Sequence, residues 1–438
     1  MSGLLAARNE ERIGSLDFIR GLAILLILFI NIEVFCYPDS FSPFRYGFIR
    51  PLDQAVRFWV YFLVQGKAID MLSLLFGAGF YLFIQSLERK GAGIRALDLY
   101  GRRLLFLFLF GVVHAYLVWD GDILYHYGIC GFFLIPFRSL PVRQLLLVLL
   151  VPVAVLSINQ LVYTGDTIQR QKEYIQLIQK DRPLRSEEEN KKVKEWAQET
   201  ERGVADTVNI EAARTTYPES IRENTKVVKL HMGNIVNRGI LFRTFIMMIL
   251  GVVLCKSGVF REYRAWIYYW PVTFFLLLTG LFMNYQRYEQ ASYRYFEPVL
   301  SYARAFEFLF AKEILAVAYV LLFNGLYQRF FNGRSSTLIS NIGKTALSNY
   351  ILQSILCGLI FYGYGLGYYN RVSRSGLLLV IPLIWAVQLV LSWLWMQYYK
   401  QGPLEALWRR LIYGKLFRAG NQSVRRFENE NGCKPVSL

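Results

Sequence analysis

The sequence predicts an all-α, polytopic transmembrane helical bundle of about ten helices, and three observations lead to this fold class. Apolar residues make up 54% of the 438 residues and aromatic residues 16%, whereas only 18% are charged. Apolar runs approaching or reaching the 20 or so residues that cross a bilayer recur along the chain. The five cysteines form no C-x-x-C pair, and four of them lie in or beside these runs, which predicts packed thiols without a disulfide framework or metal site.

The net charge of +17 is the one feature that suggests a different class of protein. A nucleic-acid-binding protein would carry basic segments interleaved with aromatic residues in a soluble context, and none is present. Membrane proteins accumulate Lys and Arg in the loops that fix their orientation. We therefore interpret the charge as a topological signal and exclude nucleic acid as a partner.

The predicted spans follow one another with short connections. The first is not a signal peptide, because no small-residue cleavage site follows it. The second run exceeds one span, so we expect an interfacial piece that enters the bilayer near Gln65. The fourth span is short and contains Gly128 and Gly131, as the wall of a cavity does. The predicted spans are 18–37, 54–87, 104–119, 123–137, 142–163, 239–255, 266–283, 299–323, 345–368 and 376–396, and an amphipathic segment at 403–412 is expected on the inner membrane surface.

The chain divides into three parts by composition. Residues 1–163 form an N-terminal transmembrane half, and residues 239–438 form a C-terminal half that ends in the amphipathic tail. Residues 164–238 contain thirteen acidic and fourteen basic residues and form an extramembrane insert. Its partial helical periodicity fits amphipathic helices that cover the site, and a charged, solvated spacer is the alternative.

The distribution of Lys and Arg predicts the orientation. Ten spans place both termini on one side of the membrane. The short segments on that side hold 23 Lys and Arg, and the short loops on the opposite side hold 7. Both termini are therefore expected in the cytoplasm, and the insert outside it.

The hairpin at 104–137 is the expected functional centre. It places His114, Asp120, Asp122 and His126 around the turn between two apolar runs, and two of the three histidines of the chain lie there. Ionisable groups are costly in a bilayer unless they face a cavity or a partner, so they indicate a functional site. One carboxylate can cap the following helix, which leaves the other unexplained. The alternative is that His114 is a hydrogen-bonded packing residue.

Further polar residues lie inside other predicted spans. Arg20 lies one turn inside the first span, where it either snorkels to the headgroups or faces an anionic ligand. Lys67 and Asp70 share a helical face and can neutralise each other. The spacing of Asn349, Tyr350 and Gln353 also places them on one face. We expect them in the same cavity as His114, with interhelical hydrogen bonding as the alternative.

Several motifs in combination resemble the bacterial YeiB family. They are LDFIRG at 16–21, LLFGAG at 74–79, and His114 followed by WDGDIL at 119–124. The C-terminal third agrees, with GKTALSNYILQS at 343–354, FYGYGL at 361–366 and QGPLE at 401–405. The resemblance covers nearly the whole chain apart from the charged insert. It implies a polytopic membrane protein related to transmembrane acyltransferases, which use cytoplasmic acyl-CoA to acylate sugars across the membrane.

One position departs from those relatives. Their first helix often reads D-x-x-R, as Asp17 and Arg20 do here, with a histidine eleven residues after the arginine. Asn31 occupies that position in this chain. A branch similar to lysosomal heparan acetyltransferase also has asparagine there and takes its histidine from elsewhere, so the departure does not exclude acyl transfer.

The resemblance suggests roles for the polar residues. A hydroxyl acceptor needs a base that titrates near neutrality, and His114 would supply it, with Asp120 or Asp122 as the orienting carboxylate. Guanidinium groups bind phosphate in a bidentate manner, so a coenzyme A donor would be held on the inner side. The expected donor contacts are Arg20, Arg102 and Arg103, and the expected substrate pocket comprises Asn31, Lys67, His126, Tyr127, Asn349, Tyr350 and Gln353.

The sequence thus predicts an integral membrane protein of the bacterial inner membrane that acylates an extracytoplasmic glycan or another hydroxyl or amine acceptor. The expected donor is acyl-CoA, and no metal is expected. The expected partners are the lipid bilayer and the acceptor, with a homo-oligomer left open. A transporter or channel for a small polar solute is the competing class. No internal repeat relates the two halves, and such a repeat is common in carriers.

Overall fold

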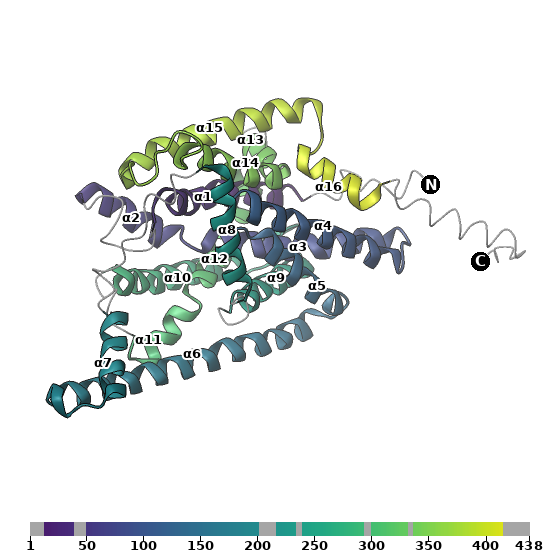
Figure 1. The fold of residues 1–438 in the computed structure, drawn as a ribbon. Coiled ribbons are helices and arrows are strands. Elements are labelled where there is room, and N and C mark those ends of the chain that lie inside the picture. The colour runs from purple at the N-terminus through teal and green to yellow at the C-terminus, as the bar shows by residue number, and fades with distance from the viewer. Residues whose placement is uncertain are drawn as a thin grey trace, which may run out of the picture.

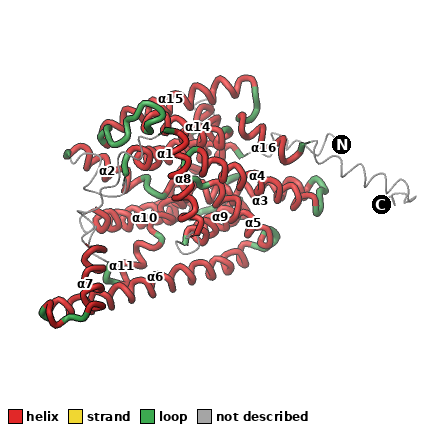
Figure 2. Tube along the Cα trace, viewed as in Figure 1, coloured by secondary structure: helices red, strands yellow, loops and turns green. Residues whose placement is uncertain are grey.

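The computed structural model describes residues 13–38, 50–200, 216–233, 239–292, 299–331 and 336–414. These residues form an all-α bundle and contain no β-strand, which confirms the predicted fold class (Figures 1 and 2). The helices are α1 (Gly14–Cys36), α2 (Pro51–Leu63), α3 (Lys67–Arg89), α4 (Arg95–Leu117), α5 (Leu124–Leu134), α6 (Val142–Gln179), α7 (Glu187–Thr200), α8 (Tyr217–Gly233), α9 (Ile240–Lys256), α10 (Tyr269–Ser292), α11 (Tyr302–Leu309), α12 (Ala311–Phe330), α13 (Thr337–Lys344), α14 (Ala346–Phe361), α15 (Arg374–Tyr398) and α16 (Pro403–Tyr413).

Each predicted span contains a helix, although several bounds differ from the prediction. Helix α4 begins at Arg95, well before residue 104, because Asp98 and Arg102 form an ion pair across one turn and extend the helix into the basic segment. The span expected at 299–323 is interrupted at Phe310, between α11 and α12.

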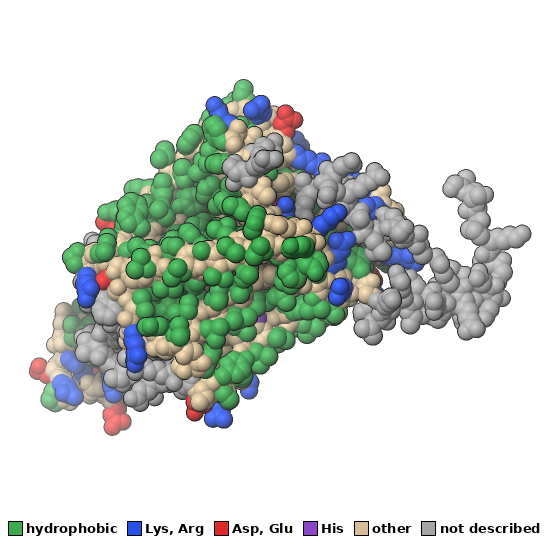
Figure 3. All heavy atoms as spheres, turned by 90° about the horizontal axis from the view of Figure 1, so that it is seen from above, with side chains coloured by type: hydrophobic (Ala, Val, Ile, Leu, Met, Phe, Trp, Pro, Cys, Tyr) green, Lys and Arg blue, Asp and Glu red, His purple; other side chains and the backbone are tan. Residues whose placement is uncertain are grey.

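Within the described residues, four helical segments are long and apolar enough to cross a membrane, namely Gly14–Cys36, Pro51–Arg89, Val142–Gln179 and Arg374–Tyr398. Helices α6 and α15 lie on opposite sides of the bundle and expose apolar side chains, such as Val151, Val162, Leu379 and Leu383, each more than 60% exposed. Viewed from above, the molecule presents a broad hydrophobic surface with charged side chains mainly at its margins (Figure 3). Apolar surface of this extent requires lipid or another apolar partner, as in a membrane protein.

Close helix contacts in the core depend on glycines. A methyl group at Gly77 of α3 would collide with the Met248 carbonyl of α9, and one at Gly251 of α9 would collide with the Leu74 carbonyl of α3. The sequence motif LLFGAG therefore lets two backbones approach closely, as small residues do between membrane helices. Gly343 of α13 plays the same part against α1.

The charged insert is helical where the structure describes it. Helix α6 continues through residue 164, where we placed the start of the insert, and ends at Gln179. A capping box starts α7, since the Glu189 amide donates to Ser186 and the Ser186 amide donates to Glu189. Hydrogen bonds from Lys180 and from Ser186 hold the pKa of Glu189 below its ordinary value.

Helix α8 of the insert packs against α4. Val228 is fully buried against Ala115 and Tyr125, and the Tyr217 hydroxyl donates to the Leu117 carbonyl over 2.9 Å. Ala115 directly follows His114. This part of the insert therefore packs beside the predicted centre.

The amphipathic helix α16 is attached to the start of α14. The carboxylate of Glu405 accepts hydrogen bonds from the amides of Leu347 and Ser348 and from the Ser348 hydroxyl. These are the N-terminal amides of α14, which carry partial positive charge. Burial raises the pKa of Glu405, and the three hydrogen bonds oppose that rise. Glu405 thus caps a helix that is distant in the sequence.

Candidate functional site

The candidate site is formed by the end of α4, the turn that follows it, and α14. His114 lies one turn before the end of α4, and Asp122 lies in the turn that leads to α5. Gly111 of α4 lets this turn approach, because a methyl group there would collide with the Tyr125 amide. The hairpin therefore folds back closely enough for Asp122 to reach His114.

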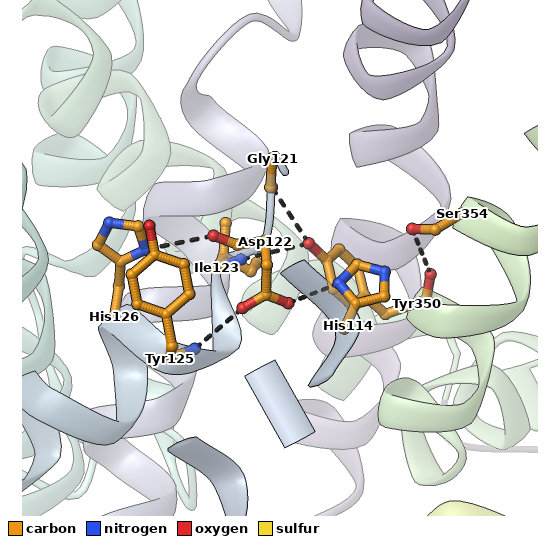
Figure 4. A network of polar contacts seen from close by, with 8 residues as sticks. All are labelled: His114, Gly121, Asp122, Ile123, Tyr125, His126, Tyr350 and Ser354. Carbon is orange, nitrogen blue, oxygen red and sulfur yellow. Dashed lines mark hydrogen bonds and ion pairs between the residues drawn. The ribbon is translucent and has the colours of Figure 1, made fainter. Parts of the chain in front are cut away.

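The central contact is a hydrogen bond between an imidazole and a carboxylate. His114 Nδ1 lies 2.7 Å from Asp122 Oδ2, and each residue is only 2% exposed (Figure 4). The Asp122 Oδ1 atom accepts a hydrogen bond of 3.0 Å from the Tyr125 amide, at the start of α5. One carboxylate therefore both caps the helix and orients the imidazole, two tasks that the sequence assigned to two aspartates.

The second imidazole nitrogen is not used in this contact. A proton on Nδ1 satisfies the Asp122 carboxylate and leaves Nε2 as the basic nitrogen. His114 Nε2 is buried and has no hydrogen-bond partner in the described part of the chain. An oriented histidine with a free Nε2 is the arrangement that general bases adopt. A packing histidine would have both nitrogens satisfied.

Tyr350 of α14 forms the opposite wall. Its ring centroid lies 5.3 Å from that of His114, and its hydroxyl accepts a hydrogen bond of 3.3 Å from the Ile123 amide and donates to the Gly121 carbonyl over 3.5 Å. Tyr350 therefore holds the turn that carries Asp122. The structure thus places Tyr350 beside His114, and its role in a substrate pocket stays a prediction.

Asn349 and Gln353 lie elsewhere on α14. The Asn349 side chain donates to Ser392 of α15, and Gln353 donates to the Ile24 carbonyl of α1 and to Gln388 of α15. These are the interhelical hydrogen bonds that the sequence left as the alternative. The rotation of α14 directs Tyr350 to His114 and the two amides to α1 and α15.

The other predicted pocket residues divide between two places. His126 Nδ1 lies 3.2 Å from the Asp122 carbonyl oxygen, and its ring stacks on Tyr125, so it stays beside the site. The Tyr127 hydroxyl donates to the Ile69 carbonyl of α3 and accepts from Ser73. Asp120 is not the carboxylate that contacts His114. Asn31 is buried in α1, and Lys67 belongs to a separate cluster at the start of α3.

The three arginines expected at the donor end differ in their contacts. Arg20 pairs with Asp17 at 3.0 Å, and Arg102 pairs with Asp98 on the surface of α4. Arg103 lies over the rings of Phe83 and Trp408, with centroid distances of 4.9 and 4.7 Å, and interacts electrostatically with Arg20. Arg20 and Arg103 therefore lie close enough to each other to interact electrostatically. The described residues contain no group of three or more metal-ligating side chains.

Sequence reasoning did not anticipate one group of charged residues. Arg243 of α9 forms an ion pair with Glu313 of α12, and its Nη1 also donates to the Leu309 carbonyl over 2.5 Å. The sequence did contain a signal for this pair, because both residues are charged and lie within or beside predicted spans. Their proximity depends on packing between helices that are 70 positions apart.

Comparison with known proteins gives relatives along the whole chain. Residues 254–415 match the family described as a protein of unknown function, DUF418. The chain is 30% identical to the uncharacterized protein YxaH of Bacillus subtilis over 434 residues, with 94% of this chain and 97% of that protein covered. It is 28% identical to the uncharacterized protein YeiB of Escherichia coli K12, with 92% and 96% covered. No solved structure matches significantly. On this similarity, the chain belongs to the YeiB and YxaH family.

Proposed function

We propose that this protein is an integral membrane acyltransferase that moves an acyl group from cytoplasmic acyl-CoA to an extracytoplasmic glycan or another hydroxyl or amine acceptor. The observation that supports it most directly is the buried His114 and Asp122 pair, with the imidazole Nε2 free. In the proposed step, Nε2 takes the proton of the acceptor as its oxygen or nitrogen attacks the thioester carbonyl. The thioester bond breaks, and coenzyme A leaves as the thiolate, which the imidazolium then protonates.

The position of the arginines supports the proposed donor. Arg103 and His114 lie eleven positions apart on α4, which is about 16 Å along the helix axis. The extended pantetheine arm of coenzyme A spans a distance of this order. With its phosphates held at Arg20 and Arg103, the thioester would reach the imidazole.

A transporter for a small polar solute is the second candidate. The interruptions between α2 and α3 and between α11 and α12 resemble the discontinuous helices of carriers. Purified protein in liposomes separates the two activities. Release of coenzyme A that requires an added glycan or amine acceptor supports acyl transfer. Passage of a small polar solute across the liposome membrane in the absence of acyl-CoA, with no release of coenzyme A, would instead support transport.

We propose that the protein lies in the bacterial inner membrane with both termini in the cytoplasm, and cysteine labelling tests this orientation. In a Cys433→Ser background the four described native cysteines are buried. Lys194→Cys on α7 and Ile94→Cys between α3 and α4 each place a thiol at an exposed position. An impermeant thiol reagent should label only the Lys194→Cys variant in intact cells. Labelling of Ile94→Cys alone would reverse the orientation.

A further inference from the structure

A second polar cluster lies where two interrupted helices meet. The break between α2 and α3 is at Gly66, whose φ of +83° suits glycine, and the break between α11 and α12 is at Phe310. The Lys312 side chain passes so close to Gly66 that a methyl group there would collide with it. The Tyr319 hydroxyl of α12 donates to the Leu63 carbonyl at the end of α2. The N-termini of α3 and α12 therefore lie near each other.

Basic side chains outnumber acidic ones in this cluster. Lys67 is 1% exposed, and its one hydrogen bond in the described chain goes to the Tyr61 carbonyl at 3.0 Å. Lys67 interacts electrostatically with Arg287 and Lys312. Arg287 also lies over the Tyr61 ring, at 5.1 Å from its centroid. The charged residues of the cluster are Lys67, Arg243, Arg287 and Lys312 against Asp70 and Glu313.

The backbone adds further donors to this cluster. No side chain caps the N-terminus of α3 or of α12. Helix N-termini carry partial positive charge and present amide donors, so they bind anions readily. Four basic side chains together with two such ends offer hydrogen-bond donors that suit an oxyanion, such as a carboxylate or phosphate group.

Hydrogen-bond acceptors without a partner in the same cluster indicate which groups a bound oxyanion would carry besides its charge. Asn284 donates to the Ala311 carbonyl over 2.6 Å, yet its own Oδ1 is buried without a partner. Burying such an atom is costly unless something pairs with it. Hydroxyl groups of a ligand would donate to these oxygens. The buried side-chain atoms without a hydrogen-bond partner in the described chain are Gln65 Oε1, Asp70 Oδ2, Asn284 Oδ1 and Glu313 Oε2, with one donor, Arg287 Nη1.

We propose that this cluster binds a small organic anion that also carries hydroxyl groups. The cations and helix N-termini hold the oxyanion, and the four acceptors receive the hydroxyls. The cluster is distinct from the His114 site, and Tyr127 lies between them, within electrostatic reach of both Asp70 and Asp122. The proposal requires neither acyl transfer nor transport, because it concerns binding alone.

Titration calorimetry on the detergent-solubilised full chain tests the proposal with three matched probes: glycerol 3-phosphate, inorganic phosphate and glycerol. Glycerol 3-phosphate carries both kinds of group and should bind most tightly. Lys312→Met, which removes one cation while keeping the length of the side chain, should weaken that binding at least about tenfold. Lys312→Arg should retain it. Lys400→Met is the matched control, because Lys400 is exposed and remote in sequence from the cluster.

Nanodiscs distinguish a lipid headgroup from a soluble ligand, since phosphatidylglycerol has the same chemistry. Weaker glycerol 3-phosphate binding in phosphatidylglycerol than in phosphatidylcholine assigns the site to the headgroup, and equal binding assigns it to a soluble anion. No binding of glycerol 3-phosphate at about 10 mM overturns the proposal, as does binding that is unchanged in Lys312→Met. If Lys312→Met is not monodisperse, Arg287→Gln takes its place with the same expected loss.

Discussion

His114→Gln should lower acyl transfer by roughly two to four orders of magnitude, the usual contribution of a general base. Glutamine keeps a donor for the Asp122 carboxylate but cannot accept a proton from the acceptor. The free energy of unfolding should therefore change little. The measurement pairs thermal melting in detergent with the release of coenzyme A per folded molecule. His231→Gln, at the third histidine of the chain, is the matched control.

The opposite pattern would assign His114 to packing. If His114 serves only in packing, the variant should reduce activity only in proportion to the loss of folded protein. Wild-type turnover per folded molecule in His114→Gln would end the claim that this residue is the base. An Arg20→Ala variant with unchanged affinity for coenzyme A would separately remove the donor site.

Arg374→Met should lower the free energy of unfolding by about 3 to 5 kcal/mol, the largest stability effect that we expect. Arg374 is fully buried at the start of α15, where its Nε lies 3.4 Å from Glu33 Oε2 of α1 and its guanidinium lies over the Tyr37 ring. Removing the arginine leaves the Glu33 carboxylate buried without this partner, and that uncompensated charge is the main cost.

A double-variant cycle checks this explanation. Combining Glu33→Gln with Arg374→Met should be less destabilising than the sum of the two single changes, because the buried charge is then absent. Arg371→Met, at an exposed position three residues earlier, should change stability by less than about 0.5 kcal/mol. A loss in Arg374→Met that is no larger than in Arg371→Met would show that the ion pair contributes little. The free energies of unfolding of these variants are measured by reversible unfolding in mixed micelles.

Much of the fold follows from the length and position of the apolar runs, since these depend on local sequence and on the thickness of a bilayer. The change near Gln65 in the second run was expected from its length, and α3 begins two residues later. The helix break at Phe310 was not, because residues 299–323 were interpreted as one continuous span. Helix rotation is equally hidden from the sequence. The spacing of Asn349, Tyr350 and Gln353 places them on one face, but only packing against α1, α4 and α15 decides which side chain reaches His114.

The candidate site was predictable in part, because it also depends on local sequence. His114 and the two aspartates stand close together in the sequence, so their proximity in space required only a hairpin. The selection of Asp122 over Asp120 depends on the geometry of the turn, in which Asp122 also receives the Tyr125 amide. The cluster around Lys312 joins helices that are distant along the chain, and no local spacing predicts such a contact.

The cap that Glu405 places on α14 has a practical consequence for expression and engineering. A chain cut before Pro403 would lose the acceptor of the Leu347 and Ser348 amides, and the start of the helix that carries Tyr350 would fray. Because Tyr350 is on the helix that loses its cap, the fraying would also disturb the contact between Tyr350 and His114. Truncations and fusion points are therefore best placed after Tyr413, the last residue of α16.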